Sequence, residues 1–172
     1  MENANVTQEM EEERQTKHKI KVVPPEALEK AFFYDAEVIA EETIDGFEVG
    51  CAILGNENLT VGRVDEIELA DGFFDFTEKY TLKTSKIHMP ARINAETEIK
   101  IQKTAEKIYR ILGCSVFARV DLFLTKDGRI VFNEINTIPG FTEHSRFPNM
   151  LKGIGLSFAE VVEAILHCGM EN

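Results

Sequence analysis

Two runs rich in β-branched and aromatic residues flank a short polar turn in the last third of the chain. The runs cover residues 116–124 and 129–135, and the turn reads Thr125-Lys126-Asp127-Gly128. An Asp-Gly pair between two such runs is a strong signal of a β-hairpin, because glycine accepts the backbone angles that tight turns need. The sequence therefore predicts an antiparallel strand pair, and the rest of the fold must be built around it.

Helices are expected where apolar residues recur at helical spacing or where capping residues stand. Pro24-Pro25-Glu26 predicts a helix start, because proline at the first helical position needs no amide partner. Residues 95–112 carry an apolar stripe. Ser157 with Glu160 three residues later forms a capping box, which predicts the start of a final helix.

Further strands are expected at residues 37–42, 47–54 and 59–67, and a polar, aromatic stretch at 71–90 has no period. A loop of that length inside a compact domain is typical of a lid or a binding loop. The order of helix, strands, lid, helix, hairpin and helix predicts an α+β domain over residues 20–172. Residues 1–19 are charged and predict a disordered lead-in.

Composition excludes several classes of protein. A net charge of −11 argues against a nucleic-acid surface, which needs clustered Lys and Arg. No apolar run approaches the ~18 residues of a membrane span, and the first twenty residues do not form a secretory signal. Three widely spaced cysteines suit a reducing compartment. We therefore expect a cytoplasmic protein of one domain, or part of a larger one.

The hairpin carries the side chains that suggest chemistry. Arg119 and Asp121 are two residues apart on the first strand, and Glu134 and Asn136 are two apart on the second, so each pair leaves one sheet face. Two carboxylates and an amide are the hard oxygen ligands that Mg²⁺ takes together with phosphate oxygens. An ordinary solvent-facing sheet surface is the alternative, and strand geometry alone leaves both open.

A long motif around the hairpin resembles the C-terminal signature of the D-alanine–D-alanine ligases. It comprises Arg119-Val120-Asp121, then Asn133-Glu134-Ile135-Asn136-Thr137-Ile138-Pro139-Gly140-Phe141-Thr142, then His144-Ser145. The resemblance runs from about residue 20 to the end. It implies the C-terminal subdomain of an ATP-grasp fold, with a mixed or antiparallel sheet and flanking helices, incomplete relative to the whole family fold.

The resemblance implies a role for each matching residue. Two Mg²⁺ ions, with Mn²⁺ as an alternative, would be held by Asp121, Glu134 and Asn136. Arg119 and the Gly140 amide would stabilise the oxyanion of the tetrahedral intermediate, and Ser145 would hold the incoming carboxylate. Tyr80, in the lid, would close the second-substrate pocket. ATP would be contacted by Glu41, Glu42, Ile44, Glu48, Lys79, Phe132 and Asn133.

One position bears on the second substrate. Arg146 stands where the D-alanine-specific members of the family usually have leucine, and Ser145-Arg146-Phe147-Pro148 is similar to the vancomycin-resistance ligases that make D-alanyl-D-serine. A cation there could hydrogen-bond a serine hydroxyl. The resemblance favours D-serine over D-alanine as the partner of the first D-alanine, in synthesis of a peptidoglycan precursor.

The resemblance does not extend to a whole ligase. The glycine-rich phosphate loop and the first-substrate domain of the family have no counterpart in residues 1–19, which contain no glycine. We expect a catalytic half that needs a complementary N-terminal half, and a homodimer is a further expectation. The alternatives are a truncated remnant or nucleotide-binding module and, less favoured, another ATP-grasp carboxylate–amine ligase.

Overall fold

The computed structural model describes residues 23–69 and 85–171. The chain divides into two units, Met1–Thr43 and Ile44–Asn172. In the first unit, helix α2 (Pro25–Phe32) begins with proline in its first turn, as predicted. Residues 37–42 form neither helix nor strand, so the strand expected there is wrong. Ile39, in the middle of that run, is 86% exposed, and no strand within the described residues pairs with the run.

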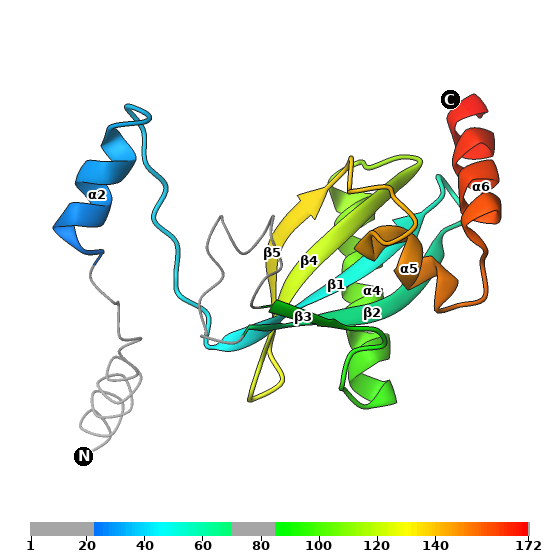
Figure 1. The fold of residues 1–172 in the computed structure, drawn as a ribbon, viewed down its shortest axis with the longest axis horizontal. Coiled ribbons are helices and arrows are strands. Elements are labelled where there is room, and N and C mark those ends of the chain that lie inside the picture. The colour runs from blue at the N-terminus through cyan, green and yellow to red at the C-terminus, as the bar shows by residue number, and fades with distance from the viewer. Residues whose placement is uncertain (1–22, 70–84, 172) are drawn as a thin grey trace, which may run out of the picture. The chain divides into compact units, whose positions relative to one another are not determined.

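The second unit is built on a five-stranded antiparallel sheet in the order β3-β2-β1-β4-β5 (Figure 1). The strands are β1 (Gly46–Leu54), β2 (Thr60–Leu69), β3 (Ser85–His88), β4 (Phe117–Thr125) and β5 (Ile130–Asn136). The predicted hairpin is confirmed as β4 and β5. Strand β3 lies inside the loop expected at 71–90, so that expectation is wrong for its last part. Its Ser-Lys-Ile-His sequence lacks the apolar run of a central strand because it pairs at the sheet edge.

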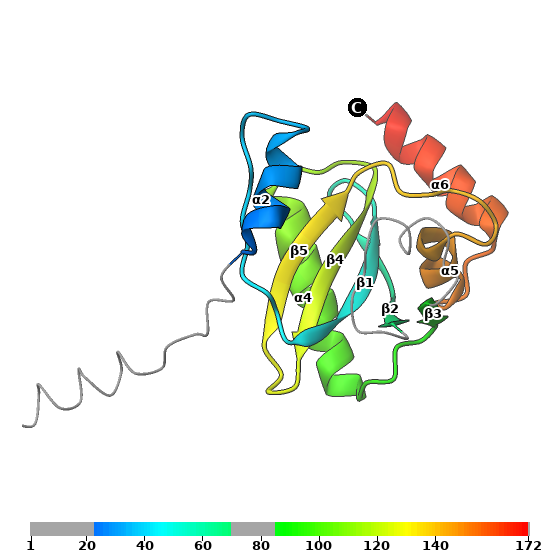
Figure 2. The same ribbon diagram turned by 60° about the vertical axis from the view of Figure 1, so that its left-hand side comes forward.

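Helices cover both faces of the sheet (Figure 2). On one face lies α4 (Ala95–Ile111), whose buried residues Ile101, Ala105 and Tyr109 join the main apolar cluster with residues of β1, β2 and β4. On the other face lie α5 (Arg146–Lys152) and α6 (Phe158–Met170). They enclose a second, smaller cluster of Ala52, Leu54, Phe147, Met150, Leu151 and Val161. The α+β architecture with flanking helices is as predicted.

Helix α5 was not expected from the sequence. It has only seven residues, and Pro148 in its first turn gives the segment a low helix propensity. The spacing of Phe147, Met150 and Leu151 is nevertheless helical, and all three are buried. The helix matters because it begins at Arg146, so it fixes where that side chain starts.

The remaining composition-based expectations concern membranes and cysteines. In the part of the chain that the structure describes, no helix has the length and apolar character needed to cross a membrane. The three cysteines are free; Cys51 is buried, and the other two are half-buried. They therefore have the interior environment that free cysteines commonly occupy.

The capping box of α6 provides a test of the local fold. The Glu160 amide donates to Ser157 Oγ (3.2 Å), and the Ser157 amide donates to the Glu160 carboxylate (2.7 Å). We expect Ser157→Ala to lower the free energy of unfolding by about 1 kcal/mol, because the cap acceptor is lost. Urea denaturation followed by circular dichroism measures it. Glu163→Ala, at an exposed site on the same helix, should change stability by less than about 0.5 kcal/mol.

Candidate metal and acyl-transfer site

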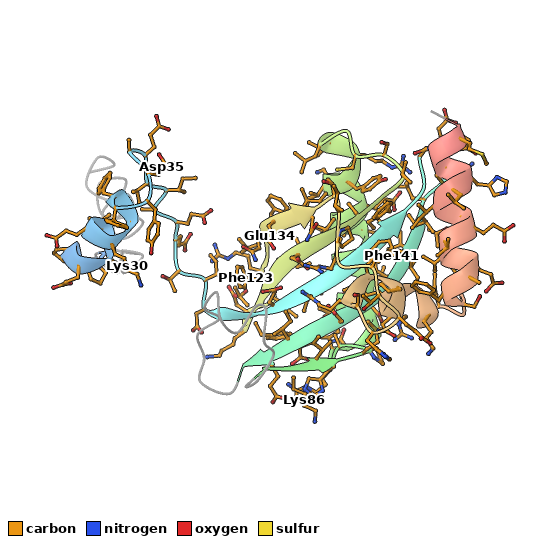
Figure 3. The ribbon with its side chains drawn as sticks, turned by 45° about the horizontal axis from the view of Figure 1, so that its top comes forward. Lys30, Asp35, Lys86, Phe123, Glu134 and Phe141 are labelled. Atoms are coloured by element: carbon orange, nitrogen blue, oxygen red, sulfur yellow. The ribbon has the colours of Figure 1, made fainter. Side chains whose placement is uncertain are left out.

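A row of directly paired residues crosses the sheet on the face that carries α5. Gly50 of β1 pairs with Asp65 of β2 on one side and with Asp121 of β4 on the other, and Asp121 pairs with Glu134 of β5. Directly paired residues of an antiparallel sheet point to the same face. We call Asp65, Gly50, Asp121 and Glu134 the carboxylate row; Figure 3 shows Glu134 on β5. The structure therefore brings together Asp121 and Glu134, as the sequence predicted.

Arg119 and Asn136 form the neighbouring pair of β4 and β5. The Arg119 guanidinium binds Asp121 at two points: Nε donates to Oδ1 (2.8 Å) and Nη2 donates to Oδ2 (2.7 Å). Asp121 is fully buried and Arg119 is 9% exposed. An ordinary solvent-facing surface, the alternative that the strands left open, is therefore wrong for these two residues. Buried charges of this kind are kept only when they are paired.

The donor set on this face fits a divalent cation that shares its coordination with phosphate. Asp121, Glu134 and Asn136 offer carboxylate and amide oxygens, and the Asn136 side chain is oriented because its Oδ1 accepts the Ile138 amide (3.1 Å). Among residues 23–69 and 85–171, no group of three or more His, Cys, Asp and Glu side chains is arranged to hold a metal by itself. Two carboxylates plus an amide leave several positions for phosphate or water, which is the usual state of Mg²⁺ in nucleotide sites.

The segment before α5 brings Gly140 close to Ser145. Ser145 Oγ accepts the Thr142 amide (2.9 Å) and lies 2.9 Å from Thr142 Oγ1. A Cβ added at Gly140 would lie 3.3 Å from Ser145 Oγ. Phe141, labelled in Figure 3, packs its ring against Phe147 of α5 and holds this segment to the helix. The two residues predicted to contact the oxyanion and the incoming carboxylate are thus neighbours.

Arg146 reaches from the start of α5 to three carboxylates. Nε and Nη2 donate to Asp65 (2.7 and 2.8 Å), Nη1 donates to Glu48 (3.2 Å), and Nη2 lies 3.4 Å from Asp121. Burial lowers the pKa of the Arg146 guanidinium, but Asp65, Asp121 and Glu48 together hold it above its ordinary value. Burial also raises the pKa of the Glu48 carboxyl, and Arg146 opposes that rise. Sequence reasoning missed Asp65, because Arg63, Glu66 and Glu68 of the same strand are also charged and nothing in the pattern distinguishes Asp65 from them.

Phe132 and Asn133 lie where the pairing of β4 and β5 shifts by one residue. Asp121 pairs with Glu134, whereas Leu122 pairs with Phe132, so Asn133 is the extra residue of a bulge. Leu122 belongs to the α4-side cluster, and Phe132 beside it is 46% exposed. The nucleotide contacts expected of both residues stay predictions.

The other expected nucleotide and lid residues are spread over the two units. Glu41 and Glu42 belong to the first unit, and Ile44 begins the second, where its carbonyl accepts the Gly46 amide (3.1 Å). Lys79 and Tyr80 lie outside the described residues. Their roles also stay predictions.

Three comparisons with known proteins agree with one another. The family model described as D-ala D-ala ligase C-terminus matches residues 17–167. The solved structure of the VanG D-Ala:D-Ser ligase from Enterococcus faecalis is 66% identical, with a TM-score of 0.76 over 83% of this chain and 42% of that chain. The vancomycin C-type resistance protein VanC2 from Enterococcus casseliflavus is 49% identical over 81% of this chain and 40% of its own length.

A more distant structure shows the same fold. The D-alanine–D-alanine ligase from Bacillus anthracis, solved in complex with ATP, is 30% identical with a TM-score of 0.69, over 85% of this chain and 47% of that chain. In these matches the chain spans about two fifths to one half of the length of its relatives.

The space above Gly50 gives a test of this geometry. A Cβ at Gly50 would lie 2.5 Å from Arg146 Nη2, 2.7 Å from Asp65 Oδ1 and 2.8 Å from Met150 Cε. We expect Gly50→Ala to lower the free energy of unfolding by about 1–3 kcal/mol, because a buried ion pair and a core side chain must move. Thermal and urea unfolding measure it. Gly169→Ala, whose Cβ would meet nothing within 4 Å, is the control. Equal stability of the two variants would contradict the packing described here.

Proposed function

Because the chain belongs to the D-alanine–D-alanine ligase C-terminal family, we propose that it supplies the Mg²⁺-, ATP- and acyl-transfer-site residues of a D-alanine–D-X ligase. The substrates are D-alanine and a second D-amino acid, joined for a peptidoglycan precursor with conversion of ATP to ADP. The observation that carries the proposal is the pairing of Asp121 with Glu134, next to Arg119 and Asn136, on one sheet face.

The described residues divide the work of such a reaction. Asp121, Glu134 and Asn136 hold the divalent cations, which neutralise phosphate charge when bound. Arg119, kept in place by its two-point bond to Asp121, stands as a fixed cation where negative charge develops on the attacked carbonyl. The first D-alanine reacts as an acyl phosphate; the amine of the second residue forms the new peptide bond, and phosphate leaves.

The second substrate is held at the segment before α5. Ser145 binds its carboxylate, and the adjacent Gly140 amide faces the oxyanion. We propose D-serine rather than D-alanine as that substrate. Two observations support it: Arg146 follows Ser145, and the VanG ligase, named for D-Ala:D-Ser, is 66% identical. The proposed contact is a hydrogen bond from the Arg146 guanidinium, whose three nitrogens lie within 3.4 Å of carboxylates, to the serine hydroxyl.

The chain spans about two fifths of the length of the VanG and VanC2 relatives, so activity is proposed only together with the remainder of a ligase. A chimera tests this: residues 44–171 replace the matching region of the VanG ligase. We expect the chimera to make D-alanyl-D-serine, seen by mass spectrometry, with release of one phosphate per dipeptide. A folded chimera that makes no dipeptide, under conditions in which the VanG ligase does, would contradict the proposal.

Glu134 offers a test of the metal role within the same chimera. Glu134→Gln keeps the shape of the side chain but removes its charge, and we expect kcat to fall about 100-fold or more, since several kcal/mol of charge stabilisation are lost. Glu163→Gln on α6 makes the same chemical change at an exposed site and should leave kcat unchanged. Dipeptide formation at saturating Mg²⁺ is the measurement. Similar kcat values for the two variants would exclude Glu134 as a metal ligand.

The second candidate is a nucleotide-binding module or remnant that no longer ligates. Exposed apolar side chains favour it for the chain alone: Phe33, Tyr34 and Ile39 of the first unit are 83%, 77% and 86% exposed. This candidate expects weak binding of Mg-ATP in a calorimetric titration, self-association by light scattering, and no dipeptide from the chimera. The ligase proposal expects the dipeptide.

A further inference from the structure

Asp65 is the one carboxylate of the carboxylate row to which the function proposed above assigns no role. It is fully buried in the middle of β2, which lies three strands from β5, the strand of Glu134, in the order β2-β1-β4-β5. A buried carboxylate is retained only where its charge is compensated and its oxygens are hydrogen-bonded. The contacts of Asp65 therefore indicate what it holds in place.

Both oxygens of Asp65 are occupied by donors of fixed direction. Oδ1 accepts the Gly50 amide of β1 (3.0 Å), which anchors the carboxylate to the backbone of the sheet. Oδ1 and Oδ2 also accept Nη2 and Nε of Arg146 (2.8 and 2.7 Å). A two-point bond between a guanidinium and a carboxylate fixes the plane of the guanidinium as well as its position. Asp65 thus sets the orientation of Arg146.

The oriented guanidinium presents its remaining donors to residues of the proposed site. Nη1 donates to Glu48 (3.2 Å), and Nη2 lies 3.4 Å from Asp121, which keeps shorter bonds of 2.7–2.8 Å to Arg119. The guanidinium has room there because Gly50 has no side chain; a Cβ would lie 2.5 Å from Nη2. While Asp65 binds the guanidinium at 2.7 and 2.8 Å, Arg146 therefore approaches Asp121 with one nitrogen only, at 3.4 Å.

We propose that Asp65 is a positioning residue for the divalent-cation site, a step that rests on the function proposed above. By binding Arg146 at two points, Asp65 keeps this cation from forming a close pair with Asp121. Without Asp65, the nearest carboxylates left to Arg146 are Asp121 and Glu48. A second arginine on Asp121 would compete with the metal for its oxygens.

The test uses Asp65→Asn, which keeps an acceptor for the Gly50 amide but removes the charge that holds Arg146. Mn²⁺ in the presence of ADP is the probe, and its binding to the chain is followed by paramagnetic broadening of backbone amide NMR signals near Asn136 and Gly140. We expect affinity to fall about 10- to 100-fold, the usual effect of losing a group that positions a metal ligand.

The structure offers a matched control in Glu98. Its carboxylate also accepts two bonds from one arginine, Arg63 (2.7 and 3.1 Å), and one backbone amide, that of Val64 (3.2 Å). It extends from α4, on the opposite face of the sheet. Glu98→Gln therefore removes an ion pair with the same hydrogen-bond pattern, at a more exposed place, without touching the carboxylate row. It should leave Mn²⁺ affinity unchanged while urea unfolding reports its own loss of stability.

A second variant separates positioning from simple destabilisation. The double variant Asp65→Asn/Arg146→Gln removes the Arg146 guanidinium as well as the Asp65 carboxylate. No second arginine is then left to pair with Asp121, so the proposal expects Mn²⁺ affinity to recover relative to Asp65→Asn. A merely structural ion pair predicts that the double variant binds no better than the single one, and that outcome would overturn the proposal. If Asp65→Asn does not fold, Gly50→Ala displaces the same guanidinium without changing any charge and should weaken Mn²⁺ binding; unchanged affinity would count against the proposal.

Failure of the inference and failure of the proposed function give different results. Equal Mn²⁺ affinities in Asp65→Asn and Glu98→Gln, with binding intact in the unsubstituted chain, would overturn the role of Asp65 alone. If neither the unsubstituted chain nor the chimera binds Mn²⁺ with ADP, the proposed metal site is overturned, and the role of Asp65 with it.

Discussion

The register between β4 and β5 is the constraint on which the proposed metal site depends. Near the turn, Leu122 pairs with Phe132, and if that register continued, Asp121 would pair with Asn133. Glu134 would then lie on the opposite face from Asp121, because successive residues of a strand alternate between faces. The bulge at Asn133 shifts the register by one residue, so that Glu134 pairs directly with Asp121 across the two strands. One extra residue thus puts both carboxylates on the face of α5.

The face so created carries more charge than a buried sheet surface can hold without compensation. Asp65 and Asp121 are fully buried, and Glu48 is nearly so, with 12% of its side chain exposed. Arg119 and Arg146 compensate them through two-point bonds, one to each aspartate. Both arginines come from elements that also build the core, β4 and α5. The elements that build the core therefore also position the charged face, and neither aspartate is left unpaired.

Much of this architecture follows from the sequence because it is encoded by local period and capping. The hairpin, α4 and the capping box of α6 were predictable, since alternation, a helical stripe and Ser157 with Glu160 each specify one element. The run at 37–42 was not a strand, since a strand needs a partner that short apolar runs do not reveal. Strand β3 was missed because it lies at the edge of the sheet, where a strand can pair through its backbone without a run of apolar side chains.

The site was predictable to the extent that its residues lie close together in the chain. Arg119 with Asp121, and Glu134 with Asn136, share a face by strand alternation alone. The cross-strand register could not be predicted, because a bulge leaves no clear mark in composition. Asp65 is 81 residues from Arg146 in the sequence, and α5, which carries Arg146 to it, is a short helix with Pro148 in its first turn. Long-range ion pairs of this kind become visible only in three dimensions.

The charge balance of this face explains why a ligase would need more than the residues described here. Of the residues that the structure describes, four carboxylates on this face, Glu48 and the three of the row, stand against the two guanidinium groups of Arg119 and Arg146. A nucleoside triphosphate adds further negative charge, which this face would repel by itself. Divalent cations reverse that balance locally, and cations beyond residues 23–69 and 85–171 can add to it. Since both arginines are already bound to aspartates, we expect phosphate binding at this face to depend on metal ions first and on the rest of a ligase second.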